Sequence, residues 1–197
     1  MERWTRRKFL AGAAQAAAGA TVLGTACGPD ETTGSAEAAF GDGRELVVPL
    51  DGTRLFRTDP NGRGETAGWQ GVETPAQGWD PVTVPSTWQV AEKTVDYLGC
   101  AWYRREFAAP VAWKGLVVRI EFEAVFHTAE VFVNGRKAGE HVGKGYTAFA
   151  FDISGLLELG ARNAVAVRVD NAFAPAMLPW SASYDWTPDG GITRPVR

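Results

Sequence analysis

The 197-residue chain has only two cysteines and two histidines, and this scarcity restricts the chemistry it can carry. It contains no Cys-x-x-Cys pair and no His/Cys cluster with the spacing of a structural zinc site. His127 and His141 stand alone in strand-like sequence, and no serine lies in a G-x-S-x-G motif. We therefore expect no metal, no cofactor and no catalytic residue of the nucleophile-histidine-acid type.

Blocks of basic residues are also absent from the body of the chain. Lys and Arg total 20 against 23 Asp and Glu, which gives a formal net charge of −3. This balance argues against a nucleic-acid partner and against binding to a membrane through a basic surface. No stretch after residue 27 has a long helical period, yet 45% hydrophobic residues are ordinary for a globular protein with a real core.

Residues 1–27 differ in composition from the rest of the chain. Arg6 and Arg7 form the arginine pair of a twin-arginine export signal, and an uncharged, Ala-rich and weakly hydrophobic run follows. Such a run suits that export route better than a stable membrane span, and its lack of a polar stripe disfavours an amphipathic helix. We expect export by this route to the periplasm or cell envelope.

Cys27 allows two processing routes at the end of this segment. The sequence Thr-Ala-Cys resembles the end of a bacterial lipobox, although Gly24 stands where Leu is usual, and in that interpretation Cys27 is lipidated and anchors the protein. Ordinary signal cleavage nearby is the alternative. Both leave no intramolecular disulfide, so core packing must hold the fold. Residues 28–43 are small, polar and acidic, and are expected to form a flexible linker.

Alternating apolar and polar residues predict strands through the remainder of the chain. Apolar and charged residues alternate through residues 116–125. Asn134-Gly135 separates two strand-like runs, as in a type I′ hairpin turn. Further strands are predicted at residues 45–52, 101–110, 148–154 and 163–171. A spacing near ten residues predicts an all-β sandwich or jelly roll.

Tryptophans and one pair of acids invite a functional interpretation. The chain has eight tryptophans, which suit either stacking on sugar rings or packing in a core, and for any single one the core is favoured. Glu121 and Glu123 suggest an acid/base pair. Because they are two residues apart on the polar face of one strand, we expect solvated side chains instead.

Several motifs, taken in order, resemble glycoside hydrolase family 2. The most specific is "FEAVFHTAEVFVNGRKAGEHVGKGYTAFAFDIS". The matching segments are residues 50–69, 82–89, 96–110, 122–154, 160–171 and 185–196. Each motif is weak alone, but together they cover nearly all of residues 45–197. One departure is "GKGYTAF" at residues 143–149, where the family usually has "GGYTPF", and it leaves the contacts of that loop open.

The resemblance implies a jelly-roll β-sandwich of the galactose-binding-domain type over residues 44–197. Family enzymes continue with an immunoglobulin-like sandwich and a (β/α)₈ barrel, and the barrel holds the two catalytic glutamates of a retaining mechanism. No segment of this chain resembles those domains. The resemblance therefore assigns no catalytic residue here, and whether the chain belongs to an active enzyme depends on domains expected downstream.

The resemblance assigns one sugar-contacting residue. Family enzymes place an Asp six residues before the Gly of a G-I-x-R motif, where it accepts hydrogen bonds from glycone hydroxyls, and that position is Asp185 here. From the residues alone, capping a turn in a Pro- and Gly-rich loop is the favoured role of Asp185, and the motif match reverses that preference. Trp186 either shields the site or packs under the loop, and Arg194 is expected to brace the loop by ion pairing.

Three functions fit these observations. The favoured one is the N-terminal sugar-binding domain of an exported enzyme that hydrolyses terminal β-O-glycosidic bonds. The alternative is a stand-alone, membrane-tethered carbohydrate-binding module without catalysis, and a remnant without function is the third. In the first two the partner is a β-glycoside, and the identity of its sugar stays open because barrel residues set it.

Overall fold

The structure is a computed structural model that describes residues 45–175, 177, 180–182 and 186–197. The expected signal and linker, with the possible lipidation of Cys27, lie outside these residues. Within them, the regular elements are β-strands and four short 3-10 helices, which confirms the all-β prediction. No helix of the described part is long and apolar enough to span a bilayer.

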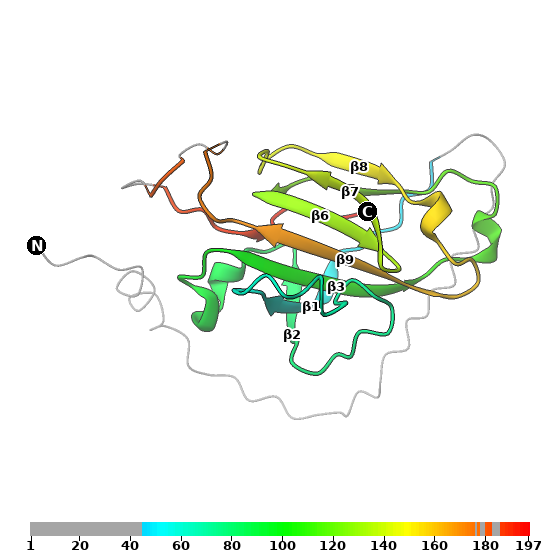
Figure 1. Ribbon diagram of the computed structural model, residues 1–197. Coiled ribbons are helices and arrows are strands. Elements are labelled where there is room, and N and C mark those ends of the chain that lie inside the picture. Colours follow the sequence, from blue (N-terminus) through cyan, green and yellow to red (C-terminus); the bar gives the residue numbers. More distant parts are fainter. Residues whose placement is uncertain (1–44, 176, 178–179, 183–185) are drawn as a thin grey trace, which may run out of the picture. The chain divides into compact units, whose positions relative to one another are not determined.

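Six antiparallel strands form the larger sheet in the order β2-β1-β3-β9-β6-β7 (Figure 1). Their bounds are β1 (Gly52–Thr58), β2 (Asp80–Val84), β3 (Cys100–Ala108), β6 (Thr128–Val133), β7 (Arg136–His141) and β9 (Arg162–Asp170). The central pair, β3 and β9, runs in continuous register from Cys100 opposite Asp170 to Ala108 opposite Arg162.

The second layer is built around residues 190–197. Its strands are β4 (Arg119–Phe122), β5 (Val125–Phe126), β8 (Phe149–Asp152) and β10 (Gly191–Ile192). β10 pairs with β5, and β4 pairs with β8. Backbone hydrogen bonds place residues 190–197 between residues 121–126 on one side and residues 50 and 86–88 on the other. The last residues of the chain are therefore an inner strand of this layer.

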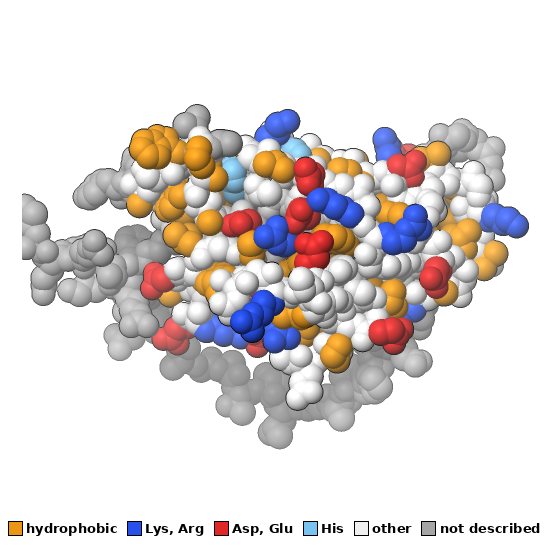
Figure 2. All heavy atoms as spheres, in the orientation of Figure 1, with side chains coloured by type: hydrophobic (Ala, Val, Ile, Leu, Met, Phe, Trp, Pro, Cys, Tyr) orange, Lys and Arg blue, Asp and Glu red, His pale blue; other side chains and the backbone are white. Residues whose placement is uncertain are grey.

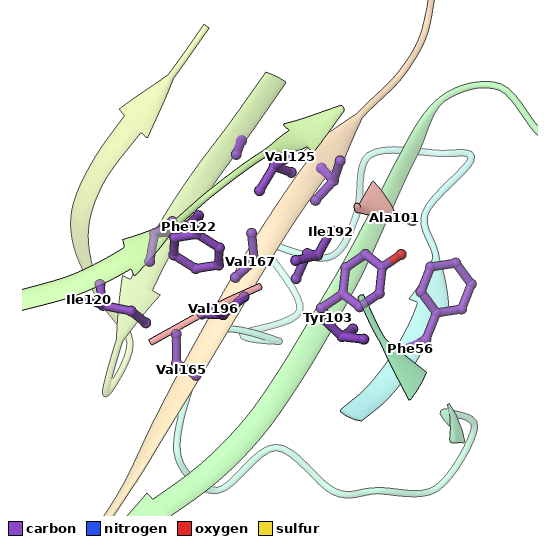
Figure 3. Close-up of a cluster of buried hydrophobic side chains, with 14 of the residues drawn as sticks. Phe56, Ala101, Tyr103, Ile120, Phe122, Val125, Val165, Val167, Ile192 and Val196 are labelled. Atoms are coloured by element: carbon purple, nitrogen blue, oxygen red, sulfur yellow. The ribbon is translucent and has the colours of Figure 1, made fainter. Parts of the chain in front are cut away.

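The main core lies between the two layers (Figure 3). Period-two alternation turns one face of each strand inward, so that Val165 and Val167 of β9 are fully buried. The inner strand of the second layer contributes Ile192 and Val196, which are 0% and 1% exposed. Burying each such side chain stabilises the fold by roughly 1.5–3 kcal/mol, so residues 190–197 are integral to the domain.

A second, smaller core lies on the outer face of the six-stranded sheet, beneath residues 59–79. Its aromatic members are Trp69, Trp79, Trp102 and Phe132. Arg104 is only 2% exposed and donates to the backbone carbonyls of Gly71 and Val72, which holds the covering segment on the sheet. For Trp79 and Trp102, both buried, the core interpretation is therefore correct.

The structure confirms the predicted hairpin but not the first predicted strand. Asn134 and Gly135 have φ of 51° and 79° and join β6 to β7, which confirms the predicted hairpin. The strand predicted at residues 45–52 is wrong, because β1 begins only at Gly52. The guanidinium groups of Arg54 and Arg105 donate to the carbonyl of Leu50. This carbonyl therefore accepts from side chains, and not from the backbone of a neighbouring strand.

Candidate functional site

The segment after β9 carries the predicted sugar-contacting motif. Asp185 lies outside the described residues, so the structure places neither its backbone nor its carboxylate. The site is therefore built from the described residues around it, which come from the end of β9, the turn before β3, the loop after β7 and residues 186–190.

The side chain of Asn171, at the end of β9, is hydrogen-bonded to the turn before β3 and to residues 186–190. It is completely buried. Oδ1 accepts the backbone N–H of Gly99 at 2.8 Å, and Nδ2 donates to the carbonyl of Pro188 at 2.6 Å. One amide thereby joins the end of β9 both to the turn before β3 and to the chain returning from the Asp185 loop. It fixes the two ends of that loop relative to one another.

Trp88 forms the floor beneath the returning chain. Its backbone N–H donates to the carbonyl of Gly190 at 3.0 Å, and its Nε1 donates to the carbonyl of Tyr97 at 3.1 Å. A Cβ atom at Gly190 would lie 2.2 Å from the Trp88 ring, so no larger residue fits without displacing the ring. Gly191 has φ of 140°, which favours glycine. The Gly-Gly pair of the motif thus has a structural reason.

An aromatic corner forms where residues 142–148 meet Trp186. Tyr146 is 66% exposed, and its ring lies edge-on to Trp186 with centroids 6.2 Å apart. Phe126 packs against Tyr146 from the second layer at 5.3 Å. Burial raises the pKa of Tyr146, and the negative charge of Asp189 raises it further. The phenol is therefore a neutral hydrogen-bonding group at physiological pH.

Trp186 is half-buried in this corner, and its indole Nε1 is buried with no hydrogen-bond partner in the structure. Its ring lies against Tyr146 at the edge of the described part of this segment. The exposed ring of Tyr146 suits a sugar, whose C–H face stacks on an aromatic ring. Hydrophobic side chains also gather at this end of the molecule, at the upper left of Figure 2.

The two histidines support the framework of this region. The backbone N–H of His127 donates to the carbonyl of Asp170, and burial lowers the pKa of its imidazole. His141 stacks on Phe149 with centroids 4.2 Å apart, and its Nε2 contacts the Thr147 hydroxyl at 2.9 Å. His141 thereby holds residues 142–148 in place. Among the described residues, no group of three His, Cys, Asp or Glu side chains is arranged to hold a metal.

Glu121 and Glu123 take part in pairing within the second layer. Arg197 donates to Glu121 at 2.8 Å and to Glu123 at 3.2 Å. Both carboxylates are thus partnered by a cation on the neighbouring strand and face no cleft between them. This arrangement agrees with a structural role and differs from the freely solvated side chains expected from the sequence.

Arg194 is exposed and makes no ion pair with the described part of the chain. Residues 183–185 of the loop lie outside the described residues, so bracing by Arg194 stays a prediction. The described link between the two ends of this segment is the buried amide of Asn171. The sequence offered no signal for this residue, because Asn after a strand is common and its two partners, Gly99 and Pro188, lie in different segments of the chain.

The comparisons with known proteins point to one family. The sequence profile described as "Glycosyl hydrolases family 2, sugar binding domain" matches residues 69–189, more than half of the chain. A putative β-glucuronidase of Formosa agariphila is 36% identical over 122 residues, and a β-galactosidase of Thermoanaerobacter pseudethanolicus is 41% identical over 105 residues. These matches span 60% and 53% of this chain but only 14% of each relative.

Solved structures give the same result. The β-glucuronidase from Ruminococcus gnavus in complex with D-glucuronic acid superposes with a TM-score of 0.71 at 25% identity. The match covers 80% of this chain and 30% of that protein. The chain therefore corresponds to a small part of the length of these relatives. By profile, by relatives and by fold, the chain belongs to glycoside hydrolase family 2 and carries that family's N-terminal sugar-binding domain.

Proposed function

We propose that this domain is the N-terminal part of an exported enzyme that hydrolyses terminal β-O-glycosidic bonds, and that it supplies contacts to the glycone. The observation that carries the proposal is the aromatic corner of Tyr146 and Trp186, the residue that follows Asp185 in the sequence. Asn171 joins the two ends of the segment that carries Asp185, and the backbone of Trp88 donates to the carbonyl of Gly190 at its returning end. A segment anchored in this way is suited to presenting one carboxylate to a ligand.

The chemistry divides between this domain and those expected to follow it. A retaining glycosidase needs two carboxyl groups roughly 5 Å apart on either side of the scissile bond. Glu121 and Glu123 are paired with Arg197, so they are not proposed for this task. Asp185 instead orients the sugar by accepting from its hydroxyls, Trp186 borders the ring, and the barrel of the complete enzyme breaks the bond.

Export is the second part of the proposal. The arginine pair at residues 6–7 and the weakly hydrophobic run after it support the twin-arginine route, and the Thr-Ala-Cys sequence supports a lipid anchor on Cys27. Mass spectrometry of the mature N-terminus tests this directly. A diacylglyceryl group on Cys27 is expected, and an intact residue 1 in the exported protein would refute processing.

The enzymatic role is tested by Asp185→Ala in a longer enzyme that joins this domain to the sandwich and barrel domains expected by the proposal. A carboxylate that accepts from two hydroxyls is worth about 1.5–3 kcal/mol per charged hydrogen bond, so kcat/KM should fall at least tenfold with the melting temperature unchanged. Asp96→Ala, at an exposed aspartate, is the matched control. Unchanged turnover by the Asp185 variant would refute the glycone contact.

A stand-alone carbohydrate-binding module is the competing function, and the exposed rings of Tyr146 and Trp180, each 66% accessible, favour it. Calorimetry with the 197-residue chain separates the two. Micromolar affinity for a methyl β-glycoside would support the module. Affinity that appears only in the longer enzyme would support the enzymatic role.

A further inference from the structure

A groove of about 370 Å³ lies at an edge of β1, apart from the aromatic corner. On one side of β1 the pairing with β2 stops at Phe56 opposite Asp80, while on the other side the pairing with β3 continues to Thr58 opposite Ala101. The last residues of β1 therefore leave an open strand edge. The groove occupies this edge, between β1, the start of β2 and the 3-10 helix Glu92–Thr94.

Arg57 supplies the most distinctive side chain of the groove. Its guanidinium carbon lies 4.3 Å from the centre of the Trp69 ring, which fixes the plane of the group. The Arg57 guanidinium makes no hydrogen bond or ion pair with any described residue. A guanidinium has five N–H donors in a rigid fork that matches a carboxylate. Those donors are held in place and unused.

The other charged residues of the lining form a pair. Lys93 pairs with Asp80, so Arg57 is the lining residue whose charge has no ion-pair partner among the described residues. The Thr58 hydroxyl has no partner among the described side chains and backbone groups. Tyr97, in the wall of the groove, donates its hydroxyl to the carbonyl of Cys100 at 2.5 Å. Anion-binding and hydroxyl-binding groups are thus combined in a space within the range of small-ligand sites.

Trp88 connects this groove to the candidate sugar site. Its Nε1 donates to the carbonyl of Tyr97, in the wall of the groove, while its ring lies against Gly190. The two sites therefore lie on opposite sides of one rigid side chain. A saccharide held at the loop has a second, cationic surface on the same domain.

We propose that this groove binds the carboxylate of an acidic sugar unit, with Arg57 as its principal ligand and the Thr58 and Tyr97 hydroxyls as contacts to the sugar. The inference rests on the proposed function only in taking a saccharide as the ligand. The groove is a secondary subsite, distinct from the loop site, for the acidic unit of a saccharide.

The test is titration of the ¹⁵N-labelled 197-residue chain with methyl β-D-glucuronide, methyl β-D-galactoside and sodium acetate, followed by NMR. We expect the glucuronide to shift the resonances of residues 56–58, 78–80 and 93–97, and the galactoside to leave them unmoved. Arg57→Gln should weaken glucuronide binding at least tenfold, and Arg57→Lys should restore it only in part, because an ammonium group cannot bind both oxygens in the plane. Arg63→Gln, at an exposed arginine outside the groove, should bind like the wild type.

The outcomes are separable from those of the proposed function. Glucuronide binding that survives Arg57→Gln but is lost in Asp185→Ala would place the ligand at the loop, which overturns the groove and leaves the enzymatic role intact. Equal shifts from acetate would show a general anion site and overturn the saccharide assignment. Absence of any shift at residues 56–58 would overturn the inference outright. Circular dichroism of each variant verifies that it is folded.

Discussion

Replacing Arg54 with methionine should stabilise this domain. Arg54 lies on the inner face of β1 within the main core and is 1% exposed. Its Nη2 donates to the carbonyl of Leu50 at 2.8 Å, but Nε and Nη1 are buried without a hydrogen-bond partner. An uncompensated buried cation is costly, and an apolar residue of similar length is often better tolerated at such a site.

The magnitude follows from the environment of the guanidinium. Burial and the neighbouring charge of Arg105 lower the pKa of Arg54 from 12.5 to about 10, which corresponds to about 3 kcal/mol against the charged form. The substitution forfeits one hydrogen bond, worth about 1 kcal/mol. The Leu50 carbonyl stays satisfied, because Arg105 Nη1 also donates to it at 2.8 Å. Arg54→Met should therefore gain about 2 kcal/mol in unfolding free energy.

Urea unfolding and calorimetry measure this gain. For a domain of this size 1 kcal/mol raises the melting temperature by about 2–4 °C, so a rise of several degrees is expected. Because the lowered pKa of Arg54 still lies near 10, both folded and unfolded chains carry the charge at lower pH, and the gain should be constant between pH 5 and 9. Arg63→Met, at an exposed arginine, should change stability by less than about 0.5 kcal/mol. A loss of 1 kcal/mol or more in Arg54→Met would refute the reasoning and imply internal partners for the guanidinium.

Three further predictions concern buried polar groups. Asn171→Ala should lower the unfolding free energy by about 2–4 kcal/mol in urea, because it orphans a buried N–H and a buried carbonyl, and Asn171→Asp, which keeps the acceptor, should lose less. Burial, and to a smaller extent the hydrogen bond and charge of Asp170, raise the pKa of the Cys100 thiol to about 11. Cys100 should therefore react with iodoacetamide at pH 8 at least tenfold more slowly than a free cysteine, as measured by peptide mapping. Equal rates would contradict this. Burial lowers the pKa of His127 below the 6.5 of an unfolded histidine, so the unfolded chain binds more protons and stability falls as the pH drops below 6.5. His127→Gln should reduce that fall, and an unchanged pH profile would exclude the contribution.

The local features of the fold were predictable because short-range chemistry determines them. Alternation in residues 163–171 places all three valines, Val165, Val167 and Val169, on one face, and β9 forms where predicted. Asn134-Gly135 accepts positive φ at both positions, so the hairpin needs no distant contact to specify it. The order of family motifs likewise predicted the sandwich and the sugar-binding assignment.

Features that depend on distant contacts were not predictable in this way. Residues 45–51 have strand-like sequence, yet arginines from β1 and β3 satisfy the Leu50 carbonyl and no regular strand forms. Asn171 becomes important only because its two partners converge on it, from 72 residues upstream and 17 residues downstream. The groove at Arg57 likewise exists only because β2 stops pairing before β1 ends.

The final residues show the same division. The sequence by itself favours extended backbone after Gly191, because the β-branched residues Ile192, Thr193 and Val196 follow it. Only the tertiary structure decided that this run is an inner strand, between residues 121–126 and residues 50 and 86–88. Pairing partners are chosen by burial and hydrogen bonding over long separations, and a strand's own residues do not encode them.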